Sequence, residues 1–170
     1  AIIPLRFEPS DRAEIVSQLL FGEHFKVLEQ NKQWYHIELQ YDGYQGWIDS
    51  KQCQLISENQ FEQLSTDPII LNADLIEYIT TPTNQLIPIP LGASLSFLYN
   101  SEINTSNFEF EGAKICGIKN KSNLINSAYL YLNAPYLWGG KTPFGVDCSG
   151  FTQMVYKLNG YHLLRVASQQ

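Results

Sequence analysis

A cysteine that could act as a nucleophile stands at position 148, between a glycine-rich segment and an amphipathic run. After it, Phe151, Val155 and Leu158 recur at the i, i+4, i+7 spacing of one helical face. Asp147 is a suitable N-cap and a glycine follows the run, so Cys148 is predicted to lie in the first turn of a helix. Unpaired N–H groups and the helix dipole favour a thiolate there, the form of cysteine that attacks carbonyl groups.

The alternative for Cys148 is structural, because a cysteine on a helix is usually a small buried apolar residue. The Asp-Cys-Ser-Gly context of residues 147–150 and the pair Gly139-Gly140 upstream favour the nucleophile. No serine triad, phosphate-binding loop or metal-ligand cluster competes with it in the sequence. We therefore expect no metal and no cofactor.

Two long motifs carry a family resemblance. Residues 135–151, Pro-Tyr-Leu-Trp-Gly-Gly-Lys-Thr-Pro-Phe-Gly-Val-Asp-Cys-Ser-Gly-Phe, resemble the nucleophile motif of NlpC/P60 cysteine peptidases, and residues 165–170 resemble the stretch that follows that helix. Val166 departs from the family pattern, in which an acidic residue is common at this position. The N-terminal half resembles bacterial SH3 (SH3b) modules, and residues 8–23 are especially similar to γ-D-glutamyl-L-diamino-acid endopeptidases.

Composition indicates an ordinary globular protein with 44% hydrophobic residues and many aromatic ones. The net charge of −6 and the lack of any basic run argue against a nucleic-acid partner. No apolar stretch is long enough to span a membrane, and no signal peptide precedes the first strand-like residues. Three widely spaced cysteines fit neither a disulfide framework nor a zinc site, and Cys53 and Cys116 are expected to pack in the core. These features favour a cytoplasmic location, with the periplasm or cell envelope as the alternative.

The sequence predicts an α+β fold with two small SH3-like β-barrels followed by the N-terminal helical part of a papain-like NlpC/P60 domain. Residues 1–57 form the first SH3b domain: residues 34–39 alternate as a strand does, and Asp-Gly within residues 41–44 indicates a hairpin. Residues 57–67 are a linker or short helix.

Residues 68–120 are expected to form a second SH3-like β domain with prolines at edges or turns. A faint repeat supports this expectation, because the pattern Gly-x-x-apolar-x-apolar-Leu that starts at Gly22 recurs at Gly92. Chance is the alternative explanation for so short a repeat.

Residues 122–170 are expected to be an incomplete catalytic domain. Leu124, Ile125, Ala128 and Leu132 share one helical face, and the nucleophile helix follows. A papain-like core also needs an antiparallel sheet that carries a histidine base, and the resemblance places that sheet beyond residue 170. We therefore expect a truncated or partial chain, inactive alone, with a third segment that is poorly stable for want of the sheet.

The histidines of this stretch are poor candidates for the base. His24 and His36 belong to the first β unit, and His162 is expected near the far end of the nucleophile helix, about 20 Å from the thiol. A general base must come within hydrogen-bond reach of the group that it deprotonates.

The resemblance implies a set of substrate-binding residues around the catalytic Cys148. Asp147 and Ser149 would line the subsite for the free amine of the peptide, Tyr136 would contact the cysteine or the substrate, and Glu14 and Tyr44 would contribute from the SH3b domain. Each has a structural alternative: helix capping for Asp147 and Ser149, packing for Tyr136 and Tyr44, and a solvated loop charge for Glu14. Trp138 is expected in the core.

The resemblance implies a cysteine endopeptidase that hydrolyses the γ-D-glutamyl–diamino acid bond of murein peptides with a free N-terminal L-Ala. Two rival functions stay open. One is a non-catalytic module that binds cell-wall peptides or a protein, with a degenerate peptidase segment; the other is an acyltransferase or amidase on a similar scaffold. The expected partners are the murein-derived peptide and the remaining C-terminal part of the catalytic domain.

Overall fold

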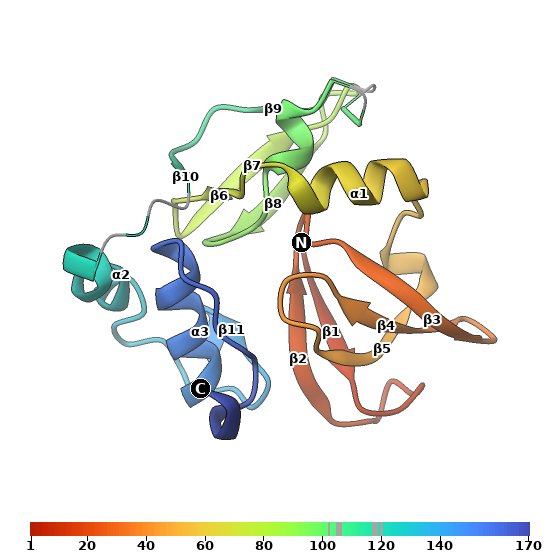
Figure 1. The fold of residues 1–170 in the computed structure, drawn as a ribbon, viewed down its shortest axis with the longest axis horizontal. Helices are drawn as coiled ribbons and strands as arrows, with labels where there is room; N and C mark the ends of the chain where they lie inside the picture. Colours follow the sequence, from red (N-terminus) through yellow and green to blue (C-terminus); the bar gives the residue numbers. More distant parts are fainter. Residues whose placement is uncertain (102, 105–106, 117–118, 120) are drawn as a thin grey trace.

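The computed structural model describes residues 1–101, 103, 104, 107–116, 119 and 121–170. The first unit is an antiparallel sheet of five strands with the order β2-β1-β5-β4-β3 (Figure 1). Its strands are β1 (Ile2–Arg6), β2 (Ile15–Leu20), β3 (Phe25–Asn31), β4 (Trp34–Leu39) and β5 (Gln45–Asp49).

The apolar residues that alternate along these strands form the core of the first unit. Leu5, Ile37 and Ile48 are fully buried in it, together with Leu19 and Leu39. The hairpin predicted at residues 41–44 joins β4 to β5, and its glycine adopts a φ of +68°, which glycine tolerates without steric cost. The strand and hairpin predictions for this unit are therefore confirmed.

The segment between the β units contains one short helix. The 3₁₀ turn η1 (Ser50–Gln52) is followed by α1 (Glu58–Thr66). The Ser57 hydroxyl accepts a hydrogen bond from the backbone N–H of Gln60, and the Gln60 side-chain oxygen accepts one from the backbone N–H of Ser57. This capping box satisfies two backbone donors and sets the start of the helix.

The second unit is built from short strands in two separate sheets. Strands β8 (Leu86–Pro90), β7 (Ile76–Thr80) and β9 (Glu109–Phe110) form one antiparallel sheet, and β10 (Lys114–Cys116) pairs with β6 (Ile70–Asn72) in the other. The 3₁₀ turn η2 (Ser96–Tyr99) lies between β8 and β9. The strand order of the first unit does not recur among the described residues, so a second barrel is not confirmed; residue 120, the predicted end of this unit, lies outside them.

The faint sequence repeat corresponds to a shared turn and not to a shared strand. Gly22 and Gly92 both have a φ of +77°. The residues after Gly22 enter strand β3 at Phe25, whereas Leu95 precedes the 3₁₀ turn η2. The repeat therefore predicts two glycine turns and nothing beyond them.

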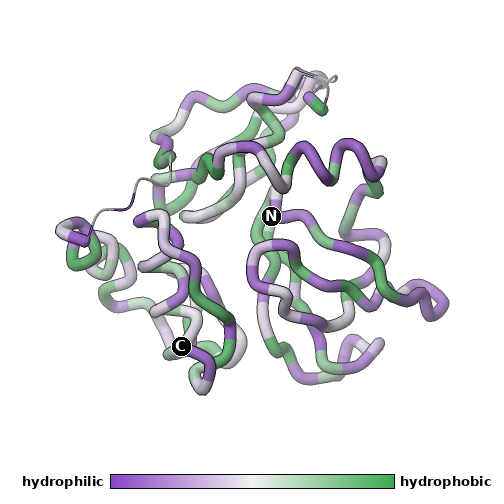
Figure 2. The backbone as a smooth tube through the Cα atoms, in the orientation of Figure 1, coloured by the Kyte–Doolittle hydropathy of each residue, from purple (hydrophilic) through white to green (hydrophobic). Residues whose placement is uncertain are grey.

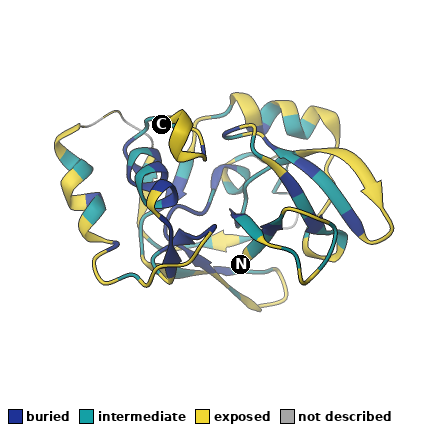
Figure 3. Ribbon diagram, turned by 90° about the horizontal axis from the view of Figure 1, so that it is seen from below, coloured by how far each residue is buried: buried dark blue, intermediate teal, exposed yellow. Residues whose placement is uncertain are grey.

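The third unit contains the turn η3 (Lys121–Asn123), α2 (Leu124–Tyr129), the strand pair β11 (Lys141–Thr142) and β12 (Gly145–Val146), α3 (Cys148–Leu158) and η4 (Ala167–Gln169). Only two of the four residues predicted to share the apolar face of the first helix pack on the core. Leu124 and Ala128 pack on the core, but Ile125 and Leu132 are 68% and 66% exposed. Figure 3 shows α2, next to the grey trace, as largely exposed and intermediate residues.

Helix α3 packs against both β units, so part of its apolar face is covered within the described residues; the predicted low stability of the third segment stays a prediction. Met154, Val155 and Leu158 are buried in one cluster with Leu20 of the first unit and with Leu71 and Leu91 of the second. Consecutive side chains of a strand point to opposite faces, so Leu19 enters the core of the first unit while Leu20 enters this shared core. The third unit is therefore stabilised by residues from both β units.

Hydropathy follows this arrangement. Figure 2 shows hydrophilic residues along the tip of the β3–β4 hairpin and over much of α1, which lie at the periphery of the molecule. None of the helices in the described part of the chain combines the length and the apolar composition needed to cross a membrane.

We expect Gly22→Ala to destabilise the protein more than Gly43→Ala. Both glycines have a left-handed φ, which costs a residue with a Cβ about 1–2 kcal/mol. A Cβ on Gly22 would also lie 2.0 Å from the carbonyl oxygen of Ser94 in the second unit, whereas a Cβ on Gly43 meets nothing within 4 Å. Urea unfolding should give a loss of about 3 kcal/mol or more for Gly22→Ala and about 1 kcal/mol for Gly43→Ala. Equal losses would contradict a close contact between the two β units at Gly22.

Candidate active site

Cys148 is the first residue of α3, and its side chain is exposed. The Asp147 side chain caps the helix by accepting a hydrogen bond of 2.7 Å from the backbone N–H of Gly150. Both features agree with the sequence prediction. The other cysteines differ in their surroundings: Cys53 is half-buried beside the first core, where burial and then the charge of Asp49 raise its thiol pKa, while Cys116 is exposed and the prediction that it packs in the core is wrong.

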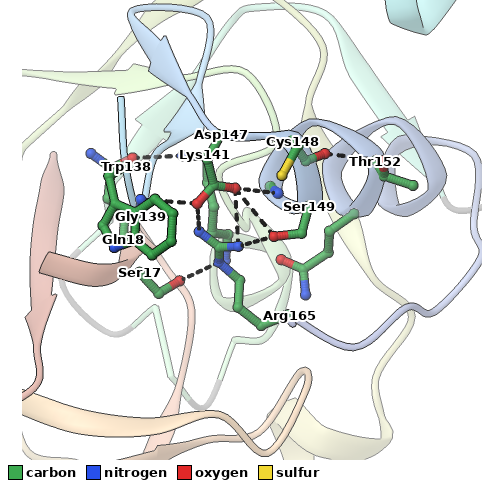
Figure 4. A network of polar contacts seen from close by, with 12 residues as sticks. Ser17, Gln18, Trp138, Gly139, Lys141, Asp147, Cys148, Ser149, Thr152 and Arg165 are labelled. Atoms are coloured by element: carbon green, nitrogen blue, oxygen red, sulfur yellow. Dashed lines mark hydrogen bonds and ion pairs between the residues drawn. The ribbon is translucent and has the colours of Figure 1, made fainter. Parts of the chain in front are cut away.

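The carboxylate of Asp147 accepts hydrogen bonds from four residues (Figure 4). Besides Gly150, the backbone N–H of Gly139 donates to it at 2.9 Å, the Ser149 hydroxyl at 3.3 Å and the Arg165 guanidinium at 2.7 and 3.1 Å. Burial alone would raise the pKa of this carboxyl, but hydrogen bonds from Arg165 and Gly150 and the Arg165 charge outweigh it and lower the pKa below its ordinary value. Asp147 is therefore an ionised group that fixes the start of α3.

Arg165 connects this network to the first unit. Its guanidinium is buried and forms a bidentate pair with Asp147, a strong and orientation-specific contact. It also donates to the hydroxyl of Ser149 at 2.7 Å and, through Nε, to the hydroxyl of Ser17 on β2 at 3.0 Å. Sequence reasoning singled out the segment that begins at Arg165 but gave this residue no role.

The turn before Cys148 needs glycine at position 139. Its φ is +78°, and a Cβ there would lie 2.4 Å from the carbonyl oxygen of Ile15 in the first unit. The turn therefore packs directly on the backbone of the first unit at Ile15, the first residue of β2, while the N–H of Gly139 reaches Asp147.

The indole of Trp138 binds a carboxylate from the first unit. Trp138 is 61% exposed, so the prediction that it packs in the core is wrong. Its Nε1 donates a hydrogen bond of 2.6 Å to Glu14, which lies immediately before β2. Glu14 thus lies beside the motif of residues 135–151, where its contact is with protein.

Tyr44 and Tyr136 lie near the same network with different exposure. Burial raises the pKa of Tyr44; the charge of Arg165 opposes this effect, and the carboxylates of Asp42, Glu14 and Asp147 reinforce it. Tyr44 therefore lies within electrostatic range of the Asp147–Arg165 pair. The backbone of Tyr136 forms an isolated β-bridge with Val146, which places it beside Asp147 and Cys148. Its side chain is accessible, since Tyr136 is 67% exposed. Substrate binding by Asp147, Ser149, Tyr136, Glu14 and Tyr44 stays a prediction.

The three histidines make contacts away from the nucleophile. His24 bonds to Ser65 of α1, and His36 stacks on Trp47 at a centroid distance of 4.9 Å. His162 follows the C-terminal end of α3, where its ring contacts the carbonyl of Tyr41, whereas Cys148 is at the N-terminal end. None of these contacts brings a histidine to the thiol.

A buried ionic cluster behind the site was not predicted. The Glu23 carboxylate, from the turn after β2, bonds to Lys157 Nζ at 2.6 Å and to Lys141 Nζ at 3.4 Å. Lys141 follows the Gly139-Gly140 turn, and Lys157 lies in the last turn of α3. Sequence periodicity carries no signal for such a cluster; the only hint is a lysine among the apolar positions of the helix.

Comparison with known proteins identifies two families in the chain. Residues 5–52 match the bacterial dipeptidyl-peptidase SH3 domain, and residues 133–170 match the NlpC/P60 family. Among curated proteins, the chain is 27% identical to dipeptidyl-peptidase 6 of Lysinibacillus sphaericus, with 94% of the chain and 68% of that protein covered. It is 26% and 25% identical to the gamma-D-glutamyl-L-lysine dipeptidyl-peptidases of Bacillus cereus and Bacillus subtilis, over 92% of the chain in each case.

The chain spans only 54% and 57% of the length of these two Bacillus relatives. Among solved structures, an NlpC/P60 family protein from Bacillus cereus superposes with a TM-score of 0.74 at 22% identity, over 92% of this chain and 59% of that one. An NlpC/P60 endopeptidase from Photobacterium damselae gives a TM-score of 0.70 at 17% identity, over 99% of this chain and 44% of that one. At these identities the two structures establish the fold.

Two features of the structure agree with these matches. The five-stranded sheet occupies the residues that match the SH3 model, and the capped helix that starts at Cys148 lies within the residues that match the peptidase model. The chain therefore combines a segment that matches the bacterial dipeptidyl-peptidase SH3 domain with a later segment that matches the NlpC/P60 family.

Proposed function

We propose that this chain carries the nucleophile of a cysteine peptidase that hydrolyses the γ-D-glutamyl–diamino acid bond of murein peptides with a free N-terminal L-Ala. The observation that carries the proposal is an exposed Cys148 at the capped start of α3, within residues that match the NlpC/P60 family. The names of the Bacillus relatives support the bond and the substrate class.

In this proposal the Cys148 thiolate attacks the amide carbonyl and forms an acyl-enzyme, and the diamino acid leaves with its amine protonated by a general acid. Water then hydrolyses the thioester and regenerates the thiol. Backbone N–H groups at the start of α3 stabilise the oxyanion, since they are unpaired within the helix and point toward its N-terminal end.

The proposed general base is a histidine outside residues 1–170, supplied by a longer form of the chain or by a partner chain. The contacts of His24, His36 and His162 with other groups support this choice. So does the greater length of the relatives.

We propose that Glu14 binds the free amine of the substrate, together with Tyr44. Glu14 is exposed at the motif, whereas Asp147 is buried and already accepts hydrogen bonds from four described residues. An ammonium group at Asp147 would have to replace one of those donors. Asp147 and Ser149 are therefore proposed to position Cys148. The exposed carboxylate of Glu14 is proposed to pair with the ammonium group of the substrate.

Cys148 is expected to be the fastest of the three cysteines to react with iodoacetamide near neutral pH. It is exposed at a helix start, whereas burial raises the thiol pKa of Cys53. Cys116 is the matched control, because it is exposed on a strand without a helix terminus. Competitive labelling followed by mass spectrometry measures all three rates in one sample, and faster labelling of Cys116 would contradict an activated thiol at Cys148.

The complete gene product is expected to cleave L-Ala-γ-D-Glu-diamino acid and to reject its N-acetylated form, whereas the 170-residue chain alone gives no turnover above its Cys148→Ala variant.

Glu14→Gln should lower kcat/KM for the free-amine peptide about 100-fold, or about 2.7 kcal/mol, because an ion pair is lost. The control is Glu8→Gln, an exposed glutamate of the same loop, which should change little. Equal turnover of the free and acetylated peptides would rule out amine recognition.

A further inference from the structure

Glu23 lies between the two segments that flank the nucleophile. Its Oε1 is 2.6 Å from Lys157 Nζ at the end of α3 and 3.4 Å from Lys141 Nζ on β11, and its Oε2 accepts the backbone N–H of Leu20 at 2.8 Å. We propose that Glu23 is a positioning residue, through which the SH3 domain fixes the placement of the nucleophile helix. This inference rests on the proposed function for its consequence in catalysis, but not for its geometry.

The cluster is shielded from water. The side chain of Lys141 is fully buried, and those of Glu23 and Lys157 are each 4% exposed. The ring of Tyr41 lies 4.8 Å from Lys157 Nζ and covers it from the SH3 side. Burial opposes ionisation of Glu23, but the two lysine charges outweigh it and keep its pKa at about 2. Burial lowers the pKa of Lys141, and the charge of Glu23 opposes that effect. Glu23 is thus an anion in contact with two buried lysine amines.

A short covalent and hydrogen-bonded path joins Lys141 to the nucleophile. Lys141 pairs in register with Val146, and Val146 is followed directly by Asp147 and Cys148. The backbone N–H of Lys141 also donates to the Gln18 side chain at 2.8 Å, so Lys141 is bound to β2 at Gln18 and to the turn after β2 at Glu23. A displacement of Lys141 would therefore move the N-cap of α3.

Lys157 is the second contact of Glu23 and lies at the C-terminal end of α3, opposite Cys148. Because Glu23 contacts both lysines, it sets the C-terminal end of α3 and the strand before its N-terminal end together. Without the carboxylate, the two cations would repel each other across a buried space. The expected result is a shift of β11 relative to α3, and a shift of about 1 Å in reacting groups can reduce a rate about 100-fold.

The first test compares Glu23→Gln with Glu29→Gln, which makes the same change on an exposed residue of β3. Steady-state hydrolysis by the complete gene product should show kcat lowered about tenfold or more by Glu23→Gln, with KM within about twofold, because the buried carboxylate does not meet substrate. Glu29→Gln should leave both constants unchanged. A kcat for Glu23→Gln equal to that of the unmodified protein would overturn the proposal.

A second variant separates positioning from stability. Glu23→Leu/Lys141→Met/Lys157→Met removes all three charges, and apolar replacement of a buried ionic cluster often preserves or raises stability. We expect its Tm to exceed that of Glu23→Gln while kcat stays low. Recovery of both Tm and kcat in the triple variant would show that the cluster stabilises the fold only, and would overturn the proposal.

Labelling of Cys148 in the 170-residue chain tests the geometry without any substrate. Iodoacetamide should modify Cys148 about threefold or more slowly in Glu23→Gln than in Glu29→Gln. The labelling rate of Cys53, which packs beside the SH3 core, should be the same in both and reports that this unit is folded. Equal Cys148 rates would overturn the positioning role, whereas a lack of hydrolysis by the unmodified gene product contradicts the proposed function alone.

Discussion

A charge that is removed from water must be paired, and in this protein the partners come from segments far apart in the chain. Glu23 pairs with Lys141 and Lys157, which lie 118 and 134 positions further along the chain. Arg165 donates to Ser17, which lies 148 positions before it. Breaking such a buried pair typically costs about 3–5 kcal/mol, because the remaining charge is left without compensation. The placement of the nucleophile helix therefore depends on strand β2 and the turn after it.

Strand β2 meets this requirement because its two faces serve different cores. Leu19 packs in the SH3 core, while Leu20 packs on the buried face of α3. Polar residues on and beside the strand then bind the Arg165 side chain, the Lys141 backbone and the two lysine ammonium groups. The SH3 unit thus forms the surface on which α3 and the segment before it pack, and its Glu14 binds Trp138 beside Cys148's motif.

Local structure was predictable from the sequence, and long-range polar contacts were not. The i, i+4, i+7 pattern after Cys148 and the capping residue Asp147 correctly predicted α3, since both signals depend on neighbouring residues. Arg165, Glu23 and Lys141 went unassigned because nothing in a local pattern distinguishes a buried, paired charge from a solvated one. Trp138 was misassigned for a related reason: an aromatic residue is usually buried, but here a distant carboxylate binds its indole N–H at the surface.

The hydrogen bond between Trp138 and Glu14 has a consequence for how such proteins can diversify. Because this hydrogen bond joins residues 124 positions apart, the SH3 unit of one relative cannot replace that of another independently of the residues that it contacts. A donor module would have to bring residues compatible with the recipient's indole, guanidinium and lysines, or lose the geometry at the junction. Recombination at the boundary between the units would therefore be filtered by selection, and positions 14, 17 and 23 should vary in concert with positions 138, 165, 141 and 157.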